Sequence, residues 1–484
     1  MTTKPTKTGK PPQKRKTVIL GAGLAGLACA YELARKQHEV LVLEGRDRVG
    51  GRIETLRQPF SKGLFAEAGA YFICAAHEWT MSYIKELLSE SELAPFKRTG
   101  KQPTIRYFVD GARSETLPKK SPVGAMLAKY IFGQQGNLVR ELMSPLPSGA
   151  PDWPPSSMTD VSFFDYLKSK NPQTWNKDKR YLFPLFKPWW GELNTVSALA
   201  VRRDAVTVLY PGPAAPWYTL RRGMDAFPEA FALKILTLPN AKIQTGSKVV
   251  EIDRTTTPLA VTYEQGGKRL TVQADHLVCA IPFTTLRKLK ISPELPTDKK
   301  TIVDNLSYNS VVRVYLQFDK RIWHPQTNNG TTFTDLRIGN LIDSTYTQPG
   351  RSGILSCYVA GDHARDLQRM DPEDRITHVK KQMEKVYEGI STHFIKGAGT
   401  SKCWDEDEWA LGAYARFGPT ELNKYSRTTI IRPEGHIHFA GDHTSPWPGW
   451  MQGALESGHR AAREIDPTID PRITNMRRPR ENQN

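Results

Sequence analysis

The sequence predicts an α/β fold with a parallel β-sheet at its centre, and two observations carry this prediction. A short β-branched run at 17–20 passes through a glycine-rich turn into a segment with helical spacing that ends at about residue 36. A second apolar run follows at 40–43. A strand, a helix and a second strand in this order form the βαβ unit of a parallel sheet.

The turn after the first predicted strand has the glycine spacing of a nucleotide-binding loop, with Gly21, Gly23 and Gly26. The first glycine permits a tight turn, the second lets the backbone approach a pyrophosphate, and the third lets the next helix lie close to the strand. That helix begins near Leu24 and Ala25 and directs its free N–H groups at the phosphates. A dinucleotide-binding site is therefore predicted at this turn.

The second predicted strand ends in Glu44, which is followed by Gly45 and Arg46. Glu44 lies 18 residues after Gly26, where an acidic side chain accepts hydrogen bonds from both hydroxyls of an adenosine ribose. Together, the strand, the glycine-rich turn, the helix and the acid are far more specific than the glycines alone. The N-terminal segment is therefore predicted to form a Rossmann-like domain.

A glycine pair, Gly50 and Gly51, follows between Arg48 and Arg52. The pair lets a second stretch of backbone reach the diphosphate, and an arginine adds charge-assisted hydrogen bonds. The segment Arg48–Thr55 resembles the R-x-G-G-R-x-x-[ST] signature of the flavin amine oxidase family. The cofactor implied by this resemblance is FAD.

The C-terminal segment 436–463 extends the same resemblance. A short apolar run at 437–440 ends at Gly441 and Asp442, and a segment with small residues along one side begins at Met451. This order resembles the closing motif of flavin amine and L-amino acid oxidases. By that resemblance the aspartate holds the ribityl or pyrophosphate region of FAD, and the N-terminus of the helix faces the flavin.

The resemblance spans nearly the whole chain. It implies a Rossmann-like FAD-binding domain of the glutathione-reductase type, an inserted α+β substrate domain and a helical subdomain. The expected division is a disordered basic tail at 1–16, the FAD-binding domain at 17–72, 222–297 and 430–466, the substrate-binding domain at 73–120 and 298–429, the helical subdomain at 121–221, and a C-terminal tail at 467–484.

The expected contacts with FAD follow from the same resemblance. They are Gly21, Gly23, Leu24, Ala25, Gly26, Glu44, Gly45, Arg46, Gly50, Gly51, Arg52, Gly69, Ala70, Val249, Gly441, Asp442, Gly449, Trp450 and Met451. Some relatives attach FAD through a cysteine at the position of Ala413, so FAD is expected to bind this chain non-covalently.

The resemblance also implies where the substrate lies. Trp450, next to Gly449, and Tyr414 match the two aromatic positions that line the substrate slot, and Tyr358 matches a tyrosine of the carboxylate clamp in L-amino acid oxidases. Positioning next to the flavin supplies much of the rate, because the cofactor carries the redox chemistry. These three aromatic residues and Arg313 are the expected catalytic residues.

Two positions depart from the family pattern. Many members carry a lysine, bonded through water to flavin N5, where this chain has Arg313, and the fork of an arginine has a different geometry. L-Amino acid oxidases commonly bind the substrate carboxylate with an arginine where this chain has Phe72, which is thus an expected substrate contact. Arg416 is a candidate for a substitute cation.

The implied reaction is the FAD-dependent oxidation of the C–N bond of an L-amino acid, or of a related primary amine, to an imine. Hydrolysis gives a keto acid or aldehyde and ammonia, and O2 is reduced to H2O2. A flavin-dependent amino acid monooxygenase and an amine dehydrogenase stay open as alternatives. A flavin-binding regulatory demethylase that docks on a basic protein tail is a further alternative.

The amino-acid composition limits the kinds of partner that the protein is expected to bind. The formal net charge is +17, but residues 1–16 alone contribute +6, so we expect no nucleic-acid partner. No run of about 18 apolar residues is present, so no membrane association is expected. The five cysteines include no C-x-x-C pair, and no metal site is expected. We expect a cytoplasmic protein whose partners are a small amine or amino acid and O2, with a homodimer as an open alternative to a monomer.

Overall fold

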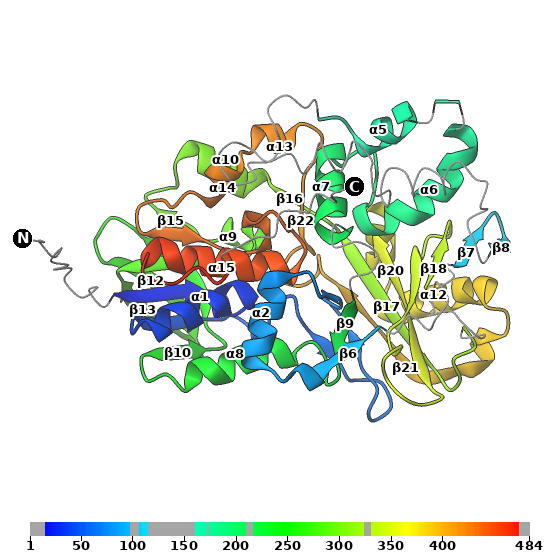
Figure 1. The fold of residues 1–484 in the computed structure, drawn as a ribbon, viewed down its shortest axis with the longest axis horizontal. Helices are drawn as coiled ribbons and strands as arrows, with labels where there is room; N and C mark the ends of the chain where they lie inside the picture. Colours follow the sequence, from blue (N-terminus) through cyan, green and yellow to red (C-terminus); the bar gives the residue numbers. More distant parts are fainter. Residues whose placement is uncertain are drawn as a thin grey trace, which may run out of the picture.

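A computed structural model describes residues 15–96, 106–114, 160–170, 172–173, 175–209, 216–323 and 331–473, and Figure 1 shows the fold. Most of the basic N-terminal tail, most of the C-terminal tail and part of the expected helical subdomain lie outside the described residues. Within the described part of the chain, no helix is both long and apolar enough to cross a membrane.

The predicted parallel sheet is present, and its strands come from three distant parts of the chain. They are β1 Lys16–Leu20, β2 Glu39–Leu43, β10 Ala241–Gln244, β14 His276–Cys279 and β23 Ile437–Phe439. The order is β10–β2–β1–β14–β23, and all neighbouring strands are parallel. The first βαβ unit therefore lies at the centre of the sheet, as the sequence predicts.

Successive side chains of β1 point into two different hydrophobic cores, because a strand alternates its faces. Ile19 packs into one core, and Val18 and Leu20 pack into the other. The first core includes the helices α1 Leu24–Arg35, α8 Ala226–Leu236 and α15 Met451–Ile465. The second includes the sheet β13–β12–β11–β15 (Lys268–Ala274, Leu259–Gln265, Lys248–Asp253, Lys290–Ser292) and the helices α9 Phe283–Leu286 and α10 Thr297–Asn305.

Two helices from opposite ends of the chain, α1 and α15, lie side by side on the parallel sheet (Figure 1). Glycines permit this close packing. A Cβ at Gly458 would lie 2.2 Å from the carbonyl oxygen of Ala25, and a Cβ at Gly26 would lie 1.9 Å from the carbonyl oxygen of Gly21. Neither position accepts a side chain unless the backbone moves.

Helix α2 (Glu78–Leu87) differs from the expected division into domains. It falls within the segment expected to belong to the substrate-binding domain, but Tyr83 and Ile84 are buried in the same core as β1 and α1. The ring of Tyr83 lies 5.1 Å from that of Phe231 in α8. The amphipathic pattern of α2 gave no indication of which neighbour its apolar face covers. The other boundaries of the division stay predictions.

A second, mixed sheet has the order β21–β17–β20–β19–β18–β7–β8. Its strands are β7 Arg106–Val109, β8 Ala112–Ser114, β17 Val311–Phe318, β18 Thr332–Thr334, β19 Asn340–Asp343, β20 Gly353–Ala360 and β21 Phe394–Cys403. The helices α11 Asp362–Gln368 and α12 Pro372–Val386 pack on one face. Every residue of β17 is buried, and Arg313 in β17 pairs with Tyr358 in β20.

The described part of the expected helical subdomain is mainly helical, but its last residues form the strand β9 (Trp217–Leu220). Its helices are α5 Phe163–Lys170, α6 Trp175–Trp190 and α7 Ala198–Leu209, with a small aromatic and aliphatic core of their own. The remaining elements are short: β3 Thr55–Leu56, β4 Ala66–Glu67, β5 Ile73–Cys74, β6 Leu93–Pro95, β9 Trp217–Leu220, β16 Ser307–Tyr308, β22 Ala415–Arg416, α13 Glu421–Lys424, α14 Arg427–Ile431, and the 3-10 turns η1 Glu90–Glu92, η3 Ile390–His393 and η4 Asp442–Thr444.

The contact between α1 and α15 leads to a first testable prediction. The Gly458→Ala variant must move the two helices apart, because its Cβ meets backbone rather than a flexible side chain. We expect the free energy of unfolding to fall by about 2 kcal/mol, as measured by urea denaturation. Lys381→Ala, at an exposed position of α12, is the control and should change it by less than about 0.5 kcal/mol. Equal stability of the two variants would contradict the tight packing at Gly458.

Candidate active site

A cavity of about 420 Å³ opens where the carboxyl ends of β1 and β2 meet the N-terminus of α1. It continues past the glycine pair to β17, β20 and the N-terminus of α15. Ligands of open parallel sheets bind at this edge, outside the carboxyl ends of the strands. The two sheets of the protein therefore contribute to one site.

Most of the residues expected from the sequence lie together in this cavity. Those that line it are Gly21, Gly23, Leu24, Ala25, Glu44, Gly45, Arg46, Gly50, Gly51, Arg52, Gly69, Ala70, Val249, Arg313, Tyr358, Tyr414, Gly441, Asp442, Gly449, Trp450 and Met451. Two expected residues, Gly26 and Phe72, are not among the lining residues.

Glu44 lies at the end of β2, close to the first turn of the glycine-rich loop. Its buried carboxylate accepts hydrogen bonds from the backbone N–H groups of Ala22 at 2.7 Å and of Arg46 at 2.9 Å. Burial raises the pKa of Glu44, and the two N–H donors offset only part of that rise. A carboxylate offers about four lone-pair positions, so acceptors remain for the two hydroxyls of a ribose.

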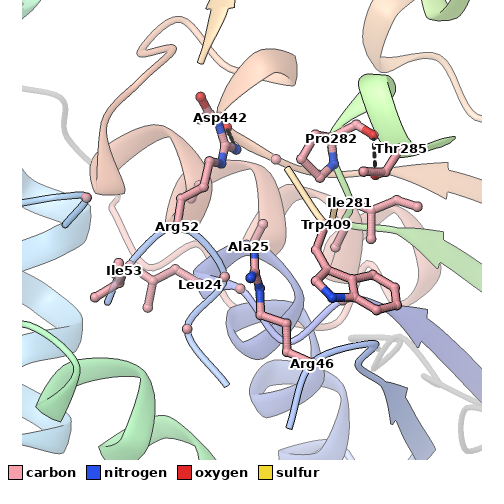
Figure 2. Close-up of a pocket in the computed structure, with 18 of the residues that line it drawn as sticks. Leu24, Ala25, Arg46, Arg52, Ile53, Ile281, Pro282, Thr285, Trp409 and Asp442 are labelled. Carbon is pink, nitrogen blue, oxygen red and sulfur yellow. Dashed lines mark hydrogen bonds and ion pairs between the residues drawn. The ribbon is translucent and has the colours of Figure 1, made fainter. Parts of the chain in front are cut away.

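Arg52 and Asp442 form an ion pair across the cavity, and Figure 2 shows their side chains pointing toward one another. Arg52 also donates to the carbonyl oxygen of Ala413 at 2.6 Å, and Asp442 accepts the backbone N–H of Gly449 at 2.7 Å. Burial raises the pKa of Asp442, but Arg52 and His443 more than offset this effect and the pKa lies below its ordinary value. The carboxylate therefore stays charged, and the ion pair links the glycine pair, the bend at Ala413 and the loop from Asp442 to Gly449.

Sequence reasoning missed a second ion pair at the cavity wall. Arg46 binds Asp407 through both oxygens, at 2.9 and 2.6 Å. The ring of Trp409 lies so close to Gly45 that a Cβ there would be 2.1 Å from it, and Figure 2 shows Trp409 beside Arg46. The dense run of acidic and aromatic residues at 404–409 was the available signal for these contacts.

Aromatic side chains form the other end of the cavity. The hydroxyl groups of Tyr358 and Tyr414 lie 3.4 Å apart, and Tyr414 donates to the carbonyl oxygen of Trp189. Burial raises the pKa of Tyr414 well above its ordinary value, so the phenol stays protonated. A Cβ at Gly449 would lie 3.1 Å from the ring of Tyr414, so the absence of a side chain there lets the chain that carries Trp450 approach this ring.

Phe72 lies in an aromatic cluster next to this end. Its ring centroid is 5.3 Å from that of Phe96 and 6.0 Å from that of Trp217. Trp217 in turn packs on Trp450, and the ring of His77 lies 5.1 Å from that of Trp450. Phe72 is not among the residues that line the cavity, and the substrate contact expected for it stays a prediction. His77 is a further neighbour that the sequence did not suggest.

The two arginines considered as cations of the site lie in different places. Arg313 is 3% exposed and lines the cavity, with Nη1 donating to the carbonyl oxygens of Glu67 and Gly69. Arg416 is not among the lining residues, and its side chain donates to the hydroxyl of Thr195. These contacts do not favour Arg416 as the substitute cation, which stays an untested prediction.

The lining residues fit FAD. Gly23 has open space where a Cβ would stand, so backbone is exposed beside the N-terminus of α1 for a diphosphate. Glu44 lines the cavity with lone pairs to spare for a ribose, and the same cavity is lined by the aromatic residues near Met451. Ala413 lines the cavity without a thiol that could form a covalent bond.

Comparisons with known proteins agree with this geometry. The family profile described as flavin containing amine oxidoreductase matches residues 24–466. A flavin-dependent L-tryptophan oxidase of Lentzea aerocolonigenes is 29% identical, with 93% of this chain and 98% of that protein covered. An L-amino-acid oxidase of Bothrops moojeni is 25% identical, with 93% of this chain and 89% of that protein covered.

Solved structures show the same fold. Cyclohexylamine oxidase from Brevibacterium oxydans superposes with a TM-score of 0.75 at 21% identity and covers 94% of this chain. Putrescine oxidase bound to putrescine superposes with a TM-score of 0.75 at 20% identity and also covers 94% of this chain. The coverage of those two proteins is 99% in both cases.

The hydrogen bonds of Glu44 predict the effect of a single substitution on cofactor binding. In Glu44→Gln only one oxygen accepts, and the amide NH2 group faces a backbone N–H donor. We expect the dissociation constant of FAD to rise about 30-fold, as measured by titration of the apoprotein with FAD. Glu39→Gln, at the exposed start of the same strand, should leave it within about twofold. A similar affinity for both variants would argue against a ribose contact.

His77 predicts a pH dependence of stability. Burial lowers the pKa of its imidazole from 6.5 to about 4, and its Nε2 has no hydrogen-bond partner. Between these two values the unfolded protein binds more protons than the folded protein, so the free energy of unfolding falls as the pH drops from about 6.5 to about 4. In His77→Phe the loss between pH 7 and pH 5 should be smaller by about 2 kcal/mol, measured by urea denaturation at each pH. An unchanged loss would mean that His77 is not held neutral.

Proposed function

Because the chain belongs to the family of flavin-containing amine oxidoreductases, we propose that it oxidises the C–N bond of an L-amino acid. The cofactor is FAD, bound non-covalently, and it accepts the hydride from the carbon that carries the amine. The products are an imine, which water hydrolyses to a keto acid and ammonia, and H2O2 from O2.

The observation that carries this proposal is the aromatic end of the cavity. Tyr358, Tyr414 and Trp450 line the cavity, and they come from three separate backbone segments. In the proposed reaction these rings exclude water and hold the substrate carbon against the flavin. Such positioning lowers the activation free energy by several kcal/mol.

Each aromatic residue has a distinct proposed role. Tyr414 is held by hydrogen bonds to Trp189 and Asn309 and forms one rigid wall of the slot. Trp450 immediately precedes the first residue of α15 and forms the opposite wall. Tyr358 presents its hydroxyl group between them and the second sheet, where it can donate to a polar group of the substrate.

An L-amino acid is preferred over a simple amine because the chain resembles curated relatives named as L-amino-acid oxidases over nearly its full length. Phe72, in place of an arginine, favours a decarboxylated primary amine as the second candidate. The fate of the oxidised substrate distinguishes three reactions. An oxidase forms H2O2 and ammonia, a monooxygenase forms an amide and CO2, and a dehydrogenase reduces O2 slowly.

Anaerobic titration tests the proposal. L-Amino acids from a panel should bleach the visible band of the bound flavin, and aerobic turnover should release H2O2 and ammonia in equal amounts. Trp450→Ala should lower kcat/KM about 100-fold with unchanged FAD content, because it removes one wall of the slot. Bleaching only by decarboxylated amines would support the second candidate. If neither panel reduces the flavin, the proposed activity is wrong.

A further inference from the structure

Arg313 is a buried cation at the cavity wall, and within the part of the chain that the structure describes only one nitrogen of its guanidinium group has hydrogen-bond partners. It lies in the middle of β17, and its side chain is 3% exposed. One nitrogen, Nη1, donates to the carbonyl oxygens of Glu67 at 2.7 Å and Gly69 at 3.2 Å. The Nε atom is buried without a partner, and the described residues offer none to Nη2 either. One edge of the guanidinium is thus fixed, and the Nε–Nη2 edge is free.

The protein does not neutralise this charge. Among the residues that the structure describes, Arg313 forms no ion pair with a carboxylate, and three tyrosine rings surround it at 5.4–5.8 Å. Glu67 interacts electrostatically with Arg313, and its carboxyl accepts hydrogen bonds from Met224 and Thr55. Burial raises the pKa of Glu67 to about 8, so this group is largely uncharged at neutral pH.

A buried cation without a counterion is costly, and it lowers that cost by binding an anion. The other basic side chains that line the cavity have different surroundings. Arg46 and Arg52 are paired with Asp407 and Asp442. Lys248 and Lys288 are exposed to solvent. Among the lining residues described, Arg313 is therefore the buried cation left to bind an anionic group from inside the cavity.

We infer that Arg313 binds the carboxylate of the substrate through its Nε–Nη2 edge, the geometry in which arginine holds a carboxylate with two parallel hydrogen bonds. Tyr358, its partner in the antiparallel pairing of β17 and β20, lies with its ring 5.4 Å from the guanidinium carbon and completes the site. Arg313 thus takes the place of the arginine that Phe72 replaces. The inference rests on the proposed function and restricts its substrates to amino acids with a free carboxylate.

Binding of a matched pair of non-reacting ligands tests the anion site without turnover. Phenylacetate and phenylacetamide have nearly the same shape and differ in charge, and binding of each to the holoenzyme changes the visible spectrum of the flavin. The wild-type protein should bind phenylacetate about 100-fold more tightly than phenylacetamide. Arg313→Met should lose this preference while its affinity for phenylacetamide stays within about threefold. Arg313→Lys keeps the charge but cannot form the two parallel hydrogen bonds of a guanidinium group, so it should recover only part of the preference for phenylacetate.

Anaerobic reduction by L-phenylalanine and by 2-phenylethylamine extends the test to substrates. Arg313→Met should raise the half-saturating concentration of L-phenylalanine about 100-fold relative to that of the amine. Arg416→Met, at a half-buried arginine that does not line the cavity, is the control and should leave this ratio within about threefold. Unchanged FAD content in each variant shows that it has folded.

The outcomes separate the inference from the proposed function. No preference for phenylacetate in the wild-type protein, or an equal preference in Arg313→Met, overturns the inference. An equal loss for the amino acid and the amine would mean that Arg313 acts only on the cofactor or on the backbone of Glu67, and this also overturns it. If phenylacetate binds through Arg313 but neither substrate reduces the flavin, the anion site stands and the proposed function fails.

Discussion

The shape of the cavity depends on one ion pair, between Arg52 and Asp442, which lie 390 positions apart in the sequence. The same two side chains also bind the backbone at Ala413 and Gly449, so the glycine pair, the bend before β22 and the loop before α15 share one charged contact. Loss of one partner of such a pair leaves a buried charge and costs about 3–5 kcal/mol. The groove for the cofactor and the slot for the substrate therefore have a fixed position relative to one another.

The cavity has two chemically different halves. In the half near the glycine-rich loop, the arginines are neutralised by acids of the protein, and backbone N–H groups are left to bind a diphosphate. In the aromatic half, Arg313 has no such acid, and neutral tyrosines surround it. Since the strength of a charge interaction grows as water is removed, this isolated cation has a larger effect on a bound molecule than the paired arginines do. The distribution of counterions, rather than the number of arginines, thus distinguishes the two halves.

Local patterns in the sequence predicted the centre of the fold well. The βαβ unit and the helix from Met451 agree with the structure to within a few residues, because each has a periodicity or a glycine spacing of its own. The partner of Arg46 and the position of Trp409 were not predictable, since they depend on segments that are distant in sequence. The same reason applies to Arg313. Its identity was visible, but its free edge and its missing counterion appear only when the two sheets are packed together.

The central position of β1 has a consequence for how the protein reaches its native state. Its strand neighbour β14, the strand β23 that pairs with β14, and its covering helix α15 are all made long after it. During synthesis on the ribosome, β1 and α1 must therefore wait with apolar surface uncovered until nearly the whole chain has emerged. Pairings over such long separations form slowly, and the uncovered intermediates are prone to aggregate. We therefore expect the apolar face of α1 to stay accessible to chaperones until α15 has been made.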